Sequence, residues 1–238
     1  MDLTVVIPVY NEAACIGALL GEMFETLPGS VDYEVIVVDD GSHDDTPAVL
    51  QDLCRDHPRL HVLRHARRSG QSAAIGSGVR AARGQWIVTL DGDGQNDPAD
   101  IMRLYEMMDN SSDQVALING YRATRRDSAL KRFASRVANT VRARVLQDNT
   151  PDSACGLRLF ARETWLALPQ FDHMHRFLPA LVQRQGGETR SLAVNHRERR
   201  GGKSKYGIVD RLWVGIVDML GVWWLQRRYS APVITEIK

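Results

Sequence analysis

The sequence predicts an α/β fold, in which a mostly parallel sheet is covered by helices on both faces. Short β-branched runs alternate with amphipathic segments through residue 120, which is the pattern of strand–helix–strand units. The 238 residues are 44% hydrophobic and 25% charged, an ordinary composition for a globular protein with a sizeable core. No linker-like run or repeat divides the chain. We expect one domain over 1–207, a helix over 208–228 and a tail over 229–238.

The elements of the first half follow from apolar periodicity. Asn11 is predicted to cap the first helix, because a short polar side chain can accept a hydrogen bond from a free helical N–H group. Asp44 and Asp45 open the second helix, and Pro98 opens the fourth. Strands are predicted over residues 3–8, 34–38, 60–63, 86–90 and 115–118. Helices are predicted over about 12–27 and 70–82, and two more begin at Asp44/Asp45 and at Pro98.

Beyond residue 120 the alternation breaks down. The second half is predicted to contain an Arg-rich amphipathic stretch at 127–146, a loop and strand at 151–160, helices near 162–168 and 175–185, a strand near 188–196 and a basic loop at 199–206. The charges divide in the same place. Residues 1–120 carry 8 Lys/Arg and 19 Asp/Glu, whereas residues 121–211 carry 19 and 8. An acidic half suits a cation and a basic half suits anions, although two solvated faces would give the same counts.

Polar residues follow three of the predicted strands. They form the segments 10–12, 39–42 and 91–95. In a parallel sheet the carboxyl ends of the strands lie at one edge, and ligands collect outside that edge. We therefore expect the three segments to meet at one crevice.

The last of these segments predicts a metal site. Asp91, Asp93 and Gln95 offer two carboxylates and an amide oxygen, which suit a hard divalent cation that also binds phosphate oxygens. An EF-hand would need Gly and Glu where the chain has Asn96 and Met102. A dinucleotide site would need GxGxxG after the first strand, where that motif is not found. A plain acidic turn stays an alternative.

Three segments together resemble the family 2 glycosyltransferases of the GT-A fold. They are VVIPVYNE at 5–12, VVDDGS at 37–42 and LDGDGQNDP at 90–98, in the family's order and each at a strand end. The resemblance spans about residues 3–206 and implies a nucleotide-sugar site with Mg²⁺ or Mn²⁺ on the diphosphate. By that resemblance the metal ligands are Asp91, Asp93 and Gln95, and the nucleotide-sugar site comprises Pro8, Tyr10, Glu12, Val38, Asp40, Asp91, Gly92 and Asp93. Core packing is the alternative for Tyr10 and Val38, and a capping turn is the alternative for Asp40.

Blocks of the second half are similar to those of dolichol-phosphate mannose synthase and bacterial polyprenyl-phosphate relatives. They are NGYR at 119–122, DSACGLR at 152–158 and RRGGKSKY at 199–206. The resemblance implies that Arg122, Arg199 and Lys205 act in catalysis with Asp93, by holding donor and acceptor phosphates. Supporting and acceptor-phosphate roles fall to Arg122, Arg132, Ser135, Ser204 and Tyr206. Guanidinium and ammonium groups suit phosphate, although a solvated basic face is the alternative.

The remaining chemistry-bearing residues predict no second site. His173 and His175 stand two apart, so they make a poor chelate on a helix and are expected at a helix start or at the surface. Three widely spaced cysteines without a CxxC pair indicate a reducing compartment, and the N-terminus lacks the basic region of a signal peptide. Nucleic-acid binding is not expected, because the basic half lacks interleaved stacking aromatics.

The segment 212–225 is almost wholly apolar and contains three tryptophans, Asp218 and flanking arginines. As a helix it is too short to cross a bilayer, so we expect it to lie at the membrane interface, on the cytoplasmic side. A buried or dimer-forming helix is the alternative, and a homo-oligomer or a small membrane partner is left open.

The resemblance implies inverting transfer of a sugar from a GDP- or UDP-linked donor to a polyprenyl phosphate at the membrane surface. One rival is transfer to a hydroxyl of a glycan or lipid, for which Asp152 is a candidate base. The other is a non-catalytic sugar-nucleotide sensor or scaffold.

Overall fold

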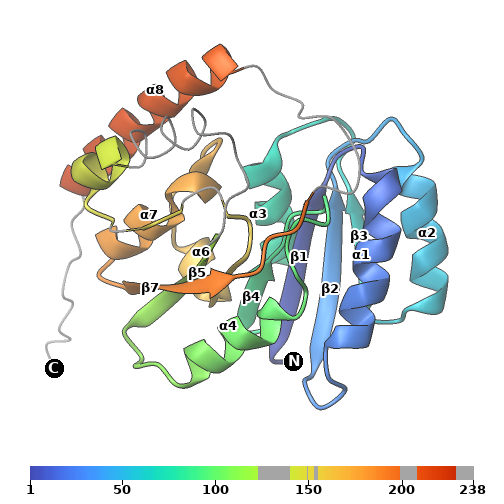
Figure 1. Cartoon of the computed structure of the whole chain (residues 1–238). Helices are drawn as coiled ribbons and strands as arrows, with labels where there is room; N and C mark the ends of the chain where they lie inside the picture. The colour runs from blue at the N-terminus through green and yellow to red at the C-terminus, as the bar shows by residue number, and fades with distance from the viewer. Residues whose placement is uncertain (123–139, 149, 153–154, 199–207, 229–238) are drawn as a thin grey trace, which may run out of the picture.

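The computed structural model describes residues 1–122, 140–148, 150–152, 155–198 and 208–228 (Figure 1). Its seven-stranded sheet has the order β3-β2-β1-β4-β6-β5-β7. The strands are β1 (Leu3–Val9), β2 (Tyr33–Asp39), β3 (Leu60–Arg64), β4 (Trp86–Thr89), β5 (Val115–Arg122), β6 (Arg158–Ala161) and β7 (Glu188–Val194). The mostly parallel α/β sheet predicted from the alternation is confirmed.

One strand departs from the parallel pattern. β6 is inserted between β4 and β5 and runs antiparallel to both of them, whereas β1–β2, β1–β4, β2–β3 and β5–β7 are parallel pairs. The sequence predicted a strand in this region but not its direction. Arg158 begins β6 opposite Thr89 of β4, so it lies at the edge where the parallel strands end.

Helices cover both faces of the sheet. They are α1 (Ala13–Thr26), α2 (Thr46–Asp56), α3 (Gln71–Ala81), α4 (Asp100–Asp109), α6 (Arg162–Leu166), α7 (Leu178–Arg184) and α8 (Ile208–Arg227), with a 3₁₀ turn η1 (Met174–Phe177). Successive residues of a strand point to opposite faces. In β1, Val5 and Ile7 pack in a core cluster with α1, α2 and α4, whereas Val6 packs in a second cluster with α3, α6, α7 and α8.

Two local predictions differ from the structure. Glu12, not Asn11, occupies the N-cap position of α1, because Asn11 adopts a left-handed conformation with φ of 53°. Its side chain instead accepts a hydrogen bond from the backbone N–H of His43. The helix predicted over 175–185 is divided into η1 and α7, with Pro179 in the first turn of α7, where its missing N–H costs no helical hydrogen bond.

Helix α8 lies along the outside of α7, on the opposite side of the molecule from α1 and α2 (Figure 1). It is 20 residues long and docks through Val222, which is fully buried. Gln226 donates to the backbone carbonyl groups of Leu146 and Ala180. In the part of the chain that the structure describes, no helix combines the length and apolar character needed to cross a membrane.

Candidate active site

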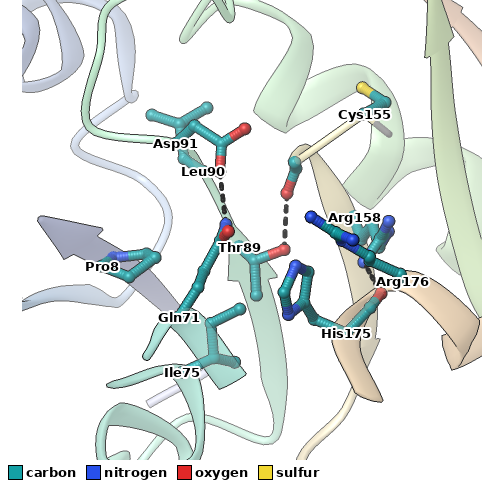
Figure 2. A pocket seen from close by; sticks show the side chains of 11 residues that line it. Pro8, Gln71, Ile75, Thr89, Leu90, Asp91, Cys155, Arg158, His175 and Arg176 are labelled. Carbon is teal, nitrogen blue, oxygen red and sulfur yellow. Dashed lines mark hydrogen bonds between the residues drawn. The ribbon is translucent and has the colours of Figure 1, made fainter. Parts of the chain in front are cut away.

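A cavity of about 130 Å³ opens at the carboxyl edge of the sheet (Figure 2). It lies between the ends of β1 and β4, the start of β6, the first turns of α3 and the turn η1. Its lining residues are Pro8, Gln71, Ile75, Thr89, Leu90, Asp91, Cys155, Gly156, Arg158, His175 and Arg176. The cavity therefore combines a carboxylate from the acidic half of the chain with two guanidinium groups from the basic half.

The loops after β1 and β2 meet each other beside this edge, but of the three polar segments predicted to share one crevice only 91–95 contributes to the cavity lining, through Asp91. The backbone N–H groups of Asn11 and Glu12 donate to the hydroxyls of Ser42 and Thr46, both at 2.9 Å. Tyr10 is only partly buried, and the guanidinium carbon of Arg68 lies 4.5 Å from the centre of its ring. Tyr10 thus lies outside the core, and Arg68 joins it from the loop before α3.

Asp40 organises that loop. Its Oδ1 accepts a hydrogen bond from the N–H of Ser69 and lies 2.7 Å from Nδ1 of His65, and its Oδ2 accepts from the N–H of Gly70 at 2.8 Å. Both carboxylate oxygens are therefore engaged in positioning the start of α3. This arrangement is close to the capping turn given as the alternative for Asp40, because the N–H groups that it binds directly precede α3. A contact from Asp40 to a base or ribose stays a prediction.

The other predicted residues of this part take different places. Val38 is fully buried in the core beside α3, so core packing accounts for its side chain. Pro8 lines the cavity, and Glu12 is nearly buried at the start of α1. Gly92 lies so close to β1 that a Cβ there would collide with the side chain of Val9. That close approach explains glycine at this position.

Asp91 is the acidic centre of the cavity. Its Oδ1 accepts a hydrogen bond from the side-chain amide of Gln71 at 2.9 Å. Burial, followed by the neighbouring Asp93 carboxylate, raises the pKa of Asp91 to about 6, and the charges of Arg158 and Arg122 oppose this increase. A Cβ on Gly156 would collide with the Asp91 carboxylate, so glycine is required for this contact.

These carboxylates fit a divalent cation. Two nearby carboxylates, one with a raised pKa, gain from a bound positive charge. Among the described residues, no three or more His, Cys, Asp or Glu side chains form a complete protein cage for a metal. Magnesium commonly uses one or two carboxylates together with substrate phosphates, so a partial protein shell is what such a site needs. Gln95 donates from its amide nitrogen toward the carbonyl of Arg197 at 3.4 Å.

Arg158 is the main residue that sequence reasoning did not single out. It is almost completely buried, donates from Nε to Oδ1 of Asn119 at 2.8 Å and donates from Nη1 to the carbonyl of His175. Burial lowers its pKa, while the charges of Cys155 and Asp91 oppose that decrease. An arginine inside the apolar run LRLF was the available signal, because buried arginines need partners.

Arg122 is held at the end of β5. Its Nε donates to Oδ2 of Asp152 at 2.7 Å and its Nη2 donates to Oδ1 at 3.0 Å, which is a bidentate pair. This pair lies close enough to the cavity for Arg122 to affect the pKa of Asp91. The remaining predicted phosphate-binding and supporting residues lie outside the described residues: Arg132, Ser135, Arg199, Ser204, Lys205 and Tyr206.

His175 lies in the turn η1 beside the cavity, and His173 immediately precedes that turn. Nδ1 of His175 lies 2.7 Å from the hydroxyl of Ser72 in α3. Burial and the charge of Arg158 hold the pKa of His175 well below its usual value, so the imidazole is neutral near pH 7. Cys155 lines the cavity, and burial raises the pKa of its thiol.

Comparison with known proteins places this geometry in a family. The profile of Glycosyl transferase family 2 matches residues 4–165. The dodecaprenyl-phosphate galacturonate synthase of Rhizobium johnstonii is 32% identical over 98% of this chain, which spans 69% of that relative. The undecaprenyl-phosphate 4-deoxy-4-formamido-L-arabinose transferase of Aeromonas hydrophila is 35% identical. That match covers 87% of this chain and 63% of the Aeromonas protein.

Solved structures show the same fold. A mannosyltransferase from Pyrobaculum calidifontis, in complex with GDP-Man and Mn²⁺, matches with a TM-score of 0.69 at 21% identity, over 97% of this chain and 66% of that one. Glucosyl-3-phosphoglycerate synthase from Mycobacterium tuberculosis, in complex with Mg²⁺ and UDP, matches with a TM-score of 0.69 at 17% identity. That match covers 94% of this chain and 79% of the synthase chain. The chain belongs to glycosyl transferase family 2 and is a glycosyltransferase with the GT-A fold.

Proposed function

We propose that this protein transfers a sugar from a nucleoside-diphosphate sugar to a polyprenyl phosphate at a membrane surface, with inversion at the anomeric carbon. The observation that carries the proposal is the cavity whose lining brings Asp91 together with Arg158 and Arg176. The names of the curated relatives support the lipid-phosphate acceptor, and those of the solved neighbours support the nucleotide-sugar donor.

The donor diphosphate would lie at the acidic centre. Asp91 and Asp93, with Gln95 as the predicted third ligand, would hold Mg²⁺ or Mn²⁺. The metal would supply positive charge to the departing nucleoside diphosphate. Tyr10 lies where the loops after β1 and β2 meet, and Pro8, in β1, lines the cavity; this is the predicted side for the base and ribose. The donor in this proposal is a UDP- or GDP-linked sugar.

The acceptor phosphate would be held by the arginines of the second half. A phosphate oxygen is already ionised near pH 7, so it can attack the anomeric carbon without a strong general base. Catalysis then depends on in-line positioning and on charge stabilisation by groups such as Arg122 and Arg158. The predicted contributions of Arg199 and Lys205 belong to the same proposal.

The surface of α8 supports the location at a membrane. Val217, Leu220 and Trp224 are each more than half exposed. They repeat at spacings of three and four, so they share one face of the helix. Arg227 follows at the end of the helix and lies 3.9 Å over the ring of Trp223, an arrangement suited to lipid headgroups. We propose peripheral binding to the cytoplasmic face through this stripe.

Transfer to a hydroxyl is the second candidate. It needs a carboxylate base, and Asp152 was the predicted one. Both oxygens of Asp152 accept hydrogen bonds from Arg122, which disfavours proton abstraction by that carboxylate. This pairing favours the phosphate acceptor.

The decisive experiment offers radiolabelled UDP- and GDP-linked sugars in parallel to polyprenyl phosphate and to a glycan acceptor, with purified full-length protein and Mn²⁺. We expect labelled lipid from one donor and none from the glycan. Asp93→Ala should abolish metal-dependent donor binding and turnover, whereas Asp113→Ala, at an exposed acid between α4 and β5, should retain both. Full turnover by Asp93→Ala would refute the metal assignment. Product on the glycan alone would favour the hydroxyl acceptor, and absence of product with every donor would favour a non-catalytic scaffold.

A further inference from the structure

One wall of the cavity is built by a turn, not by strand ends. His175 and Arg176, in η1, line the side opposite Pro8 and Gln71 (Figure 2). The other walls come from the sheet and α3, which are fixed by ladders and helical hydrogen bonds. The position of η1 depends instead on side-chain contacts that reach it from several elements.

Three contacts hold the segment 172–176 from the α3 and β6 sides. The N–H and Nδ1 of His175 both lie within hydrogen-bonding distance of the Ser72 hydroxyl, at 3.3 and 2.7 Å. Arg158 donates to the carbonyl of His175. Asp172 packs against Gly70, where a Cβ would lie 3.0 Å from its Oδ1. The segment is thereby tied to the same loop that Asp40 positions.

The fourth contact comes from outside the cavity. His173 adopts a left-handed conformation with φ of 62°, which non-glycine residues seldom adopt without support from their surroundings. Its Nδ1 lies 3.0 Å from Oδ2 of Asp218, which is on α8. Asp218 interrupts the apolar run of that helix, and its side chain is mostly buried against the turn.

We propose that Asp218 is a positioning residue of the cavity, although it lies on the peripheral helix. By holding His173, it fixes the left-handed residue from which η1 starts and so sets the positions of His175 and Arg176. The helix thus has two separable faces. One carries the exposed stripe, and the other holds a wall of the cavity. The proposal rests on the proposed function only in treating the cavity as the donor site.

The test uses full-length protein and measures the affinities for UDP and for GDP in the presence of Mn²⁺ by calorimetry. Asp218→Ala should weaken nucleotide binding roughly tenfold, because η1 is no longer held. Asp218→Asn should restore most of the affinity, because its amide oxygen can still accept from His173. Ile216→Ala, at an exposed position of α8 outside the stripe, is the matched control and should bind as the wild type does.

A second readout needs no ligand. NMR of the histidine side chains, with His175 assigned through His175→Gln, should show a shifted His175 signal in Asp218→Ala and an unshifted one in Ile216→Ala. Wild-type affinity and an unshifted His175 signal in Asp218→Ala would overturn the proposal. Should that variant not fold, His173→Asn removes the same contact while allowing the left-handed backbone, with the same expectations. Failure of the wild type to bind either nucleotide would count against the proposed function, and the NMR comparison would still decide this inference.

Discussion

At the residue scale, the contact between Gly156 and Asp91 is the tightest feature of the cavity. Gly156→Ala would drive a Cβ into the Asp91 carboxylate. We expect Mn²⁺-dependent nucleotide affinity to fall roughly tenfold or more, equivalent to about 1.4 kcal/mol. The measurement is calorimetric titration with UDP or GDP.

The matched control for this change is Gly21→Ala. Apart from its chain neighbours and the backbone of α1 itself, no atom lies within 4 Å of a Cβ built there. This variant should keep the nucleotide affinity and gain up to about 1 kcal/mol of stability from helix propensity. Equal affinities in the two variants would contradict the close-contact explanation.

The raised pKa of Asp91 makes a prediction about stability and pH. Its folded-state pKa of about 6 exceeds the usual aspartate value of 3.8, so the folded, metal-free protein binds this proton more tightly than the unfolded chain does. The resulting stabilisation is present below pH 4 and is lost as the pH rises through about 6. Asp91→Asn should therefore be more stable than the wild type at pH 7.5, by urea unfolding without metal, and the difference should shrink toward pH 4. A difference that does not change with pH would refute this account.

Some residues of the site could be predicted from the sequence next to them, and others could not. Asp91 and Asp93 could be predicted because they follow an apolar strand in direct succession. Gln71 and Arg158 could not, because their roles depend on which distant segments the fold brings against Asp91. The side chain of Val38 takes the core position given as its alternative, and its place in the nucleotide-sugar site stays a prediction.

At the element scale, the exposed stripe of α8 has the clearest consequence. The double change Leu220→Ser and Trp224→Ser removes two large apolar side chains from the surface without touching Val222, the buried docking residue. Burying such side chains contributes about 1.5–3 kcal/mol each, so binding to vesicles that contain acidic phospholipid should weaken at least tenfold. Co-sedimentation measures this. Leu166→Ser, at a similarly apolar exposed position on α6, should leave vesicle binding unchanged. Undiminished sedimentation of the double variant would exclude the stripe as the lipid-binding surface.

Strand and helix boundaries in the first half could be predicted closely because each element has its own periodic pattern. β1, for example, covers the predicted run with one residue added at its end. The division of the helix near 175–185 could not be predicted, because the turn η1 is held by Ser72 and Arg158 from other elements.

At the scale of the whole molecule, the charge division becomes a spatial arrangement. The net charges of −11 over residues 1–120 and +11 over 121–211 meet at the cavity, where Asp91 faces Arg158 and Arg176. Counts alone could not decide between a site and two solvated faces. The fold favours the site, because β6 brings a buried arginine across to the acidic side.

Ligand binding at this junction should stabilise the entire fold. At a nucleotide concentration 100 times its dissociation constant, the gain is about 2.7 kcal/mol. For a chain of this size, Mn²⁺ with the correct nucleotide should raise the Tm by about 5–10 °C, measured by differential scanning fluorimetry. Asp93→Ala should lose most of this increase while keeping its response to unrelated stabilisers such as sucrose. The same increase in that variant would show that the nucleotide binds elsewhere.

The reversed direction of β6 also decides where this protein can change without losing its chemistry. In β1, β2 and β4 the end of the strand that lies far from the cavity is its beginning. In β6 it is the last residue, Ala161, which lies opposite Trp86. Substitutions near Ala161 should therefore appear as losses of folding yield, and those at Arg158 as losses of turnover. A mutational scan that expects losses of turnover at the carboxyl end of every strand would therefore look for them at the wrong end of β6.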